Sequence, residues 1–194
     1  MSSSDWSYSW RAKLGEVVER VRSRYHHIGR KTAAPFLCVV YPPDQEVAVH
    51  QEWHAQSESL GPDFTLHRVD VLEVTSQIIA DIGADNIVDA LEHPGPGFTP
   101  QEDLAEKFVS TLSAQILERI ATSDKSRKPI VSVEHIAALH PACGPRDLLH
   151  AMWDRAQSTL DAPVILLVPG ELRDTRTYSF LGLINEFMYR GDLL

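Results

Sequence analysis

The chain has 194 residues, a length that suits one α/β domain with a hydrophobic core of its own. No apolar run reaches the ~20 residues that a membrane-spanning helix needs, and a net charge of −9 argues against broad nucleic-acid binding. The first residues show no apolar segment of a secretory signal, and Cys38 and Cys143 are the two cysteines. We therefore expect a single cytoplasmic domain over 1–194, with free thiols and neither a membrane nor a nucleic acid as partner.

Positive charge is concentrated near the N-terminus. Seven Lys or Arg and two Glu lie between residues 11 and 31, whereas fifteen acids and three Lys or Arg lie between residues 40 and 120. Apolar residues recur at three- and four-residue steps over 8–26, which predicts an amphipathic helix. Its polar side carries Arg11, Arg20 and Arg24. This basic side either meets an acidic partner or is simply solvated.

Two continuous apolar runs indicate strands that are buried on both faces. Residues 164–168 are apolar throughout, and Pro169-Gly170 is expected to end that strand. A similar run over 35–41 ends at Pro42. The remaining expected strands cover 129–133, 186–190 and 64–71, which alternates apolar and polar residues as a strand near a sheet edge does.

Helical spacing of apolar residues indicates further helices between these strands. The clearest start is Thr99-Pro100-Gln101-Glu102, which reads as a capping box with Thr99 as the N-cap and Pro100 at the first helical position. Asp44 is expected to cap the helix that follows the first strand. These helices are expected over 45–59, 71–82, 85–91, 99–121 and 144–160, with a shorter one over 178–184.

Strands thus alternate with helices along the chain. Such an order predicts right-handed crossovers and a mostly parallel sheet between two helical layers. We therefore expect a three-layer α/β/α sandwich with four to five strands.

A three-layer α/β fold raises the possibility of nucleotide binding. A phosphate-binding loop needs the pattern G-x-x-x-x-G-K-[ST] after the first strand, because backbone N–H groups and a lysine surround the phosphates. The chain has Pro42-Pro43-Asp44-Gln45-Glu46 there, with two prolines, two acids and no lysine. This turn should repel a polyphosphate.

Three groups of polar residues are candidates for metal binding or catalysis. His50 and His54 have the spacing of two metal ligands on one helix, but the residues between them do not match metalloprotease patterns, so a solvated helix face is the simpler interpretation. Glu134-His135 and His140 follow a predicted strand, where catalytic groups often lie, and Cys143 is close in sequence. The alternative is a role in capping and loop structure. We expect no catalytic residue, metal or cofactor.

Four segments occur in an order that is typical of one protein family. They are Val40-Tyr41-Pro42-Pro43-Asp44, the segment 133–141, the segment 163–170, and Phe180-Leu181-Gly182 with Phe187-Met188-Tyr189-Arg190. Over about residues 18–190 the chain resembles the BrxB family, small proteins encoded in bacteriophage-exclusion (BREX) defence systems. Met188 departs from the family pattern, which has an aromatic residue there.

The resemblance implies a fold like that of P-loop nucleotide hydrolases without their phosphate-binding (Walker A) loop. It also implies a non-catalytic adaptor that binds other BREX proteins, above all a large PglZ-type protein resembling alkaline phosphatases. The alternatives are a degenerate nucleotide- or small-ligand-binding domain and an enzyme that uses His135, His140 or Cys143. Whether the protein forms a homodimer is left open. We expect the contact surface to include Arg11, Arg20, Arg24, Pro42, Asp44, His140 and Glu171.

Overall fold

A computed structural model describes residues 4–28, 35–156, 160 and 162–194, without the side chains of 4–9, 24 and 27. The helices are α1 (Ser4–Arg24), α2 (Glu46–Ser57), α3 (Val71–Ile82), α4 (Ala84–Glu92), α5 (Pro100–Ala121) and α6 (Pro145–Ala156). The strands are β1 (Phe36–Tyr41), β2 (Phe64–Asp70), β3 (Lys128–Glu134), β4 (Val164–Leu172), β5 (Thr177–Phe180), β6 (Ile184–Phe187) and β7 (Asp192–Leu193). Single 3-10 turns cover Tyr25–His27, Pro43–Gln45, Glu58–Leu60 and Ile136–Leu139.

Strand β4 lies at the centre of the sheet. It pairs in parallel with β1 on one side and with β3 on the other. Strand β2 pairs with β3, and β7 with β1, which gives the order β2-β3-β4-β1-β7. The residues of β4 are buried from Val164 to Gly170. The structure therefore confirms the prediction that this apolar run is a strand buried on both faces, and β2 is an edge strand as expected.

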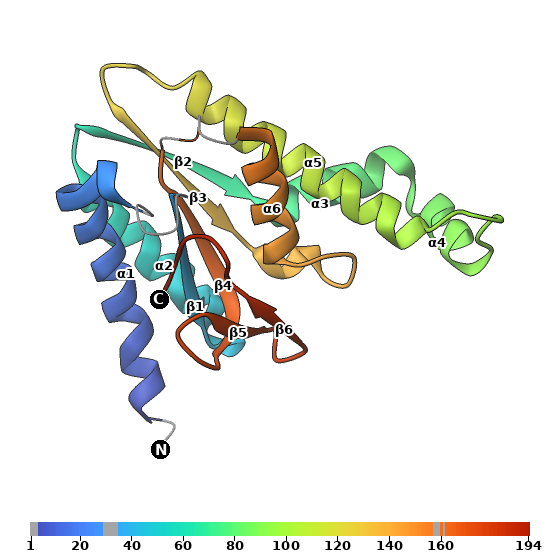
Figure 1. The fold of residues 1–194 in the computed structure, drawn as a ribbon, viewed down its shortest axis with the longest axis horizontal. Helices are drawn as coiled ribbons and strands as arrows, with labels where there is room; N and C mark the ends of the chain where they lie inside the picture. Colours follow the sequence, from blue (N-terminus) through green and yellow to red (C-terminus); the bar gives the residue numbers. More distant parts are fainter. Residues whose placement is uncertain (1–3, 29–34, 157–159, 161) are drawn as a thin grey trace.

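Helices cover both faces of this sheet (Figure 1). On one face, the apolar stripe of α1 and the buried side of α2 pack against Leu37, Val39 and Tyr41 of β1. On the other face, α3, α5 and α6 pack against the alternate residues Cys38 and Val40. The predicted three-layer α/β/α sandwich with a mostly parallel sheet is confirmed.

The C-terminal part of the sheet departs from the prediction. Strand β4 does not end at Pro169-Gly170 but continues to Leu172, because antiparallel β5 replaces β1 as its partner and pairs Gly170 with Phe180. The segment expected to be a short helix, 178–184, instead forms most of β5 and the turn into β6, since short apolar runs do not distinguish helix from strand. The described residues therefore form a seven-stranded sheet where four to five strands were expected.

The helix starts are close to their expected places, but neither predicted cap forms. Asp44 lies inside the 3-10 turn Pro43–Gln45, and α2 begins only at Glu46. Helix α5 begins at Pro100 as predicted, but the Thr99 side chain makes no capping hydrogen bond. Helix α6 ends at Ala156, and residues 157–159 of the expected helix lie outside the described residues.

Gly170 permits a close approach of two strands. A Cβ atom at this position would lie 2.3 Å from the Ser179 carbonyl oxygen on β5. We therefore expect Gly170→Ala to lower the free energy of unfolding by about 1–3 kcal/mol, because backbone must shift to make room. In the control, Gly15→Ala in α1, the new Cβ meets only Gln56 Oε1 at 3.6 Å, and the free energy of unfolding should rise by up to about 1 kcal/mol.

Urea unfolding followed by circular dichroism measures both variants. If Gly170→Ala were as stable as the parent protein, the pairing of β4 with β5 would be contradicted.

Candidate functional site

Polar side chains gather where β2 and β3 end. The two strands are in register, so their last residues, Asp70 and Glu134, lie side by side. Helix α2 crosses the same end of the sheet and brings His50 and His54 from consecutive turns, on one side of the helix. We call these side chains, together with His135, the strand-end cluster.

The Glu134 carboxylate is the centre of this cluster. Its Oε2 atom lies 3.0 Å from His54 Nε2 and 3.5 Å from His50 Nδ1. The Ser132 hydroxyl donates a hydrogen bond of 2.7 Å to Oε1, and Arg68 Nε lies 3.6 Å from the same oxygen. The chain thus compensates the charge of this buried carboxylate with its own side chains.

These contacts decide the protonation state of Glu134. Burial alone would raise the pKa of its carboxyl, but contacts with His50, His54 and Ser132 outweigh burial and lower the pKa to about 2. Glu134 is therefore ionised at neutral pH and ties α2 to the end of β3.

A second histidine–carboxylate contact lies beside the first. His135 follows β3 in a left-handed conformation with φ of 55°, and its Nδ1 lies 3.0 Å from Asp70 Oδ2 in an ion-pair contact without hydrogen-bond geometry. Its ring stacks on the ring of His50, with 4.3 Å between centroids. His50 is buried, and neither of its ring nitrogens makes a hydrogen bond. The cluster therefore joins β2, β3 and α2 through one stacked ring pair and through imidazole–carboxylate contacts.

The spacing of His50 and His54 does bring two imidazoles together, but onto a carboxylate. The prediction of a solvated helix face is wrong for His50, which is buried because it packs between Tyr41 and His135. His54 is half exposed. Across the part of the chain that the structure describes, no group of three or more His, Cys, Asp or Glu has the arrangement of a metal site.

The cluster and the thiol singled out in the sequence differ in chemistry. A carboxylate that holds one imidazole nitrogen, as Glu134 holds His54, supports proton transfer at the other nitrogen. Cys143, by contrast, lies just before α6 and is buried, and burial, followed by Asp147 and Glu186, raises the pKa of its thiol to about 12. A thiol that stays protonated is a poor nucleophile. His140 is half buried, and its Nδ1 makes no hydrogen bond.

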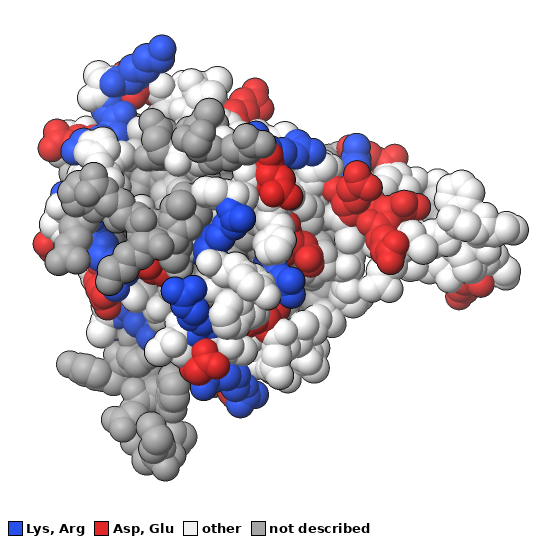
Figure 2. Space-filling view, viewed as in Figure 1, with Lys and Arg blue, Asp and Glu red and all other residues white. Residues whose placement is uncertain are grey.

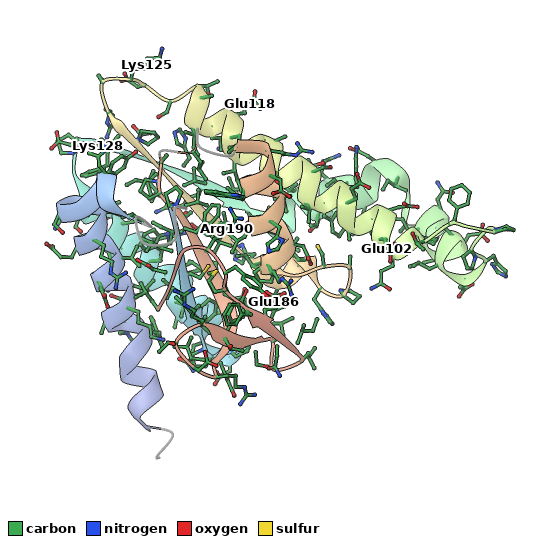
Figure 3. The ribbon with its side chains drawn as sticks, viewed as in Figure 1. Glu102, Glu118, Lys125, Lys128, Glu186 and Arg190 are labelled. Atoms are coloured by element: carbon green, nitrogen blue, oxygen red, sulfur yellow. The ribbon has the colours of Figure 1, made fainter. Side chains whose placement is uncertain are left out.

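A second buried carboxylate, which the sequence analysis did not single out, holds the start of α6. Glu186 of β6 accepts a hydrogen bond from the Tyr178 hydroxyl and one of 3.1 Å from the Arg146 N–H (Figure 3). Burial raises the pKa of Glu186, although these two bonds oppose the shift. A carboxylate is stabilised at a helix N-terminus, and a Cβ at Gly144 would lie 2.0 Å from Glu186 Oε1. Glu186 is thus a structural anchor, with no pattern in the sequence to reveal it.

The basic residues predicted to bind a partner lie on α1. Arg11 Nε lies 3.6 Å from Glu52 Oε2 of α2, and Arg20 Nη1 lies 2.9 Å from Asp192 Oδ2 of β7. Both arginines are therefore used in contacts within the chain. Arg24 is the last residue of α1, and its side chain is outside the described part.

The other predicted contact residues come from other elements. Pro42 is half buried and Asp44 exposed in the connection from β1 to α2, and Glu171 is exposed on the extension of β4. His140 lies in the connection from β3 to α6, whose buried residues pack in the layer of α3, α5 and α6. Helix α1 covers the opposite face of the sheet. The seven residues thus come from α1, from the connections after β1 and β3, and from the extension of β4.

A further exposed apolar surface lies on residues 81–106, which we call the arm. The arm comprises the end of α3, the whole of α4, the loop after it and the start of α5, and it extends away from the sheet (Figure 1). Helix α4 has no buried residue. Leu91 is 48% exposed and Phe98 69% exposed, and Val88 is also exposed.

A cleft of about 660 Å³ lies along the arm, between α4, α5 and the residues that precede α6. The arm carries seven acidic residues and no Lys or Arg. Figure 2 shows acidic side chains gathered over α5 where the arm leaves the body, beside a largely uncharged tip. The apolar lining comprises Leu91, Pro94, Pro100, Ala105, Val109 and Ala142, and the acids around it are Glu102, Glu106 and Asp147. The one-sided charge of this segment was the sequence signal that could have singled it out.

No protein-family model, no curated protein and no solved structure matches the chain. Among the helices of the described residues, none combines the length and the apolarity needed to cross a bilayer.

The lowered pKa of Glu134 predicts a specific pH dependence. Because the pKa is near 2 in the folded protein and near 4.5 for an ordinary Glu, the ionised carboxylate stabilises the fold above pH 4.5, and this contribution is lost as pH falls from 4.5 to 2. We expect Glu134→Gln to lower the free energy of unfolding by about 1–3 kcal/mol at pH 7, with a smaller difference at lower pH.

Urea unfolding of both proteins between pH 2 and pH 7 measures this difference. Glu171→Gln, at an exposed position, is the matched control and should change stability by less than about 0.5 kcal/mol. A Glu134→Gln effect that stayed constant with pH would show that the carboxylate's charge is not what ties α2 to β3.

Proposed function

We propose that the protein is a BrxB-type component of a bacteriophage-exclusion system and acts as a non-catalytic adaptor in the bacterial cytoplasm. Its partner is another protein of the same system, a PglZ-type protein resembling alkaline phosphatases. The observation that carries the proposal is the exposed apolar surface of the arm. The order of sequence motifs over residues 18–190 supports the choice of family.

The exposed apolar side chains of the arm add no stability to a protein that acts alone. Helix α4 has nine residues, too few for a stable helix in water without tertiary contacts, and it packs chiefly against α3 and α5. Leu91 and Phe98 remain in solvent, although burying such side chains stabilises a structure by about 1.5–3 kcal/mol each. Exposed apolar patches of this kind mark interaction surfaces.

The turn after β1 favours a protein partner over a nucleotide. It forms a 3-10 turn in which the Gln45 N–H donates to the Pro42 carbonyl oxygen at 2.9 Å. The N–H groups of a phosphate-binding loop point at the ligand instead. Asp44 and Glu46 add negative charge at the same place, which disfavours a phosphate.

Purification of the tagged protein together with the proteins encoded beside it tests the proposal. We expect a PglZ-type protein to be retained in a fixed ratio. The double variant Leu91→Ser/Phe98→Ser should retain at least tenfold less of it, because the apolar contact area is lost. The matched control is Val47→Ser/Leu183→Ser, which changes two side chains that are 72% and 68% exposed outside the arm, and it should bind as the parent protein does.

The outcomes separate the two parts of the proposal. If the parent protein retained none of the co-encoded proteins, the adaptor function would be wrong. If the arm variant and the control bound equally well, the adaptor function would stand and the arm would not be its contact surface. In that case, substitutions on the predicted surface with Arg11, Arg20, Pro42 and Glu171 would be tested next in the same co-purification experiment.

A further inference from the structure

The cleft along the arm is large enough to bind a few side chains of another protein. Its volume of about 660 Å³ falls within the range of about 300–1,000 Å³ that is usual for binding pockets. Its lining is mainly apolar, with Leu91 on one side and Ala105 and Val109 of α5 on another. Leu91, which lines the cleft from α4, is about half exposed and therefore open to an incoming chain. An amphipathic segment that inserts apolar side chains is the ligand that fits this shape.

The charges around the cleft favour a segment with a positive net charge. Glu102 and Glu106 are exposed on the first turns of α5, and Asp147 lines the cleft from α6 (Figure 3 labels Glu102). No lysine or arginine is among the lining residues. An acidic segment would be repelled, whereas Lys or Arg beside the apolar anchors would meet carboxylates at the rim.

Neither the arm nor helix α1 of a second copy of this chain fits the cleft. Two arms facing each other would oppose seven acids with seven acids. The basic helix α1 of a second copy could offer only its charged side, because Trp10, Leu14 and Val21 are already buried in its own core. A lipid surface is also disfavoured, since amphipathic helices that lie on membranes carry Lys and Arg on their polar face.

We propose that the cleft of the arm binds a basic amphipathic segment of the partner protein, with apolar anchors seated against Leu91, Ala105 and Val109 and with Lys or Arg side chains next to Glu102 and Glu106. This inference rests on the proposed function only in that the segment belongs to a protein of the same system. The chemistry of the cleft can be tested without that protein.

Three synthetic amphipathic helical peptides of about 18 residues serve as probes. They share one stripe of leucines, and their polar positions are filled with Lys, Gln or Glu. Isothermal titration should show the Lys peptide binding the full-length protein at least tenfold more tightly than the Gln peptide, with no binding of the Glu peptide. Raising the ionic strength from about 0.1 M to about 1 M should lower the affinity of the Lys peptide more than that of the Gln peptide. The reason is that the Debye length falls from about 10 Å to about 3 Å.

Two charge variants locate the binding. The double variant Glu102→Lys/Glu106→Lys should bind the Lys peptide at least tenfold more weakly than the parent protein does. The control variant Glu58→Lys/Asp63→Lys makes the same charge change at two exposed acids outside the arm. It should lower the affinity for the Lys peptide less than threefold. Circular dichroism confirms that both variants fold.

If both variants lowered the affinity of the Lys peptide equally, binding would depend on the net charge of the protein and not on the cleft, and the inference would be overturned. Failure of the Lys peptide to bind, or equal binding of the Gln peptide, would overturn it as well. Each of these results leaves the co-purification experiment untouched, so the adaptor function and the chemistry of its cleft can fail separately.

Discussion

The fold depends on a central strand that is apolar on both faces. Because β4 is buried from Val164 to Gly170, helices must cover the sheet on both sides. Helices α1 and α2 cover one face, and α3, α5 and α6 cover the other. Helix α4 has no buried residue and takes no part in either layer. The arm therefore carries apolar side chains, among them Val88, Leu91 and Phe98, that remain exposed outside both helical layers.

Two buried carboxylates connect the helical layers to strand ends. Glu134 holds α2 through His54, and Glu186 holds the first turn of α6 through the Arg146 N–H. A buried carboxyl group is tolerated only when its oxygens are paired or hydrogen-bonded, and both groups meet this condition with partners from their own chain. These interactions fix the framework from which α5 and the arm extend.

Much of this fold follows from patterns that can be read in the sequence. The apolar run 164–168 and the stripe on α1 each predicted an element and its burial, because apolar periodicity reports which faces are covered. The alternation of 64–71 predicted a strand near the sheet edge. The C-terminal hairpin was predicted only in part, because the expected strand 186–190 overlaps β6 at 186–187 whereas the region of β5 was expected to be helical. Its strands β5 and β6 have four residues each, too short for a period of two to be distinguished from one helical turn.

The sites were harder to predict than the fold, because they depend on contacts between distant residues. Glu134-His135 was recognised as a polar pair after a strand, but its partners His50 and His54 lie about 80 positions away, and His54 was assigned to a solvated face. The cleft of the arm joins residues from α4, α5 and α6, which no local pattern connects. Its acidity was readable, since residues 81–106 contain seven acids and no Lys or Arg, but exposure of Leu91 and Phe98 becomes evident only in three dimensions.

The most direct test of this account is photo-crosslinking in cells that carry the complete exclusion system. A photoreactive phenylalanine analogue replaces Phe98 on the arm, and the same analogue at Val47 serves as the control. The account predicts that the arm position gives one dominant product, joined to a Lys- and Arg-rich segment of a protein of the same system, and that the control position does not. Cross-links from Val47 alone, or equal products from both positions, would contradict it.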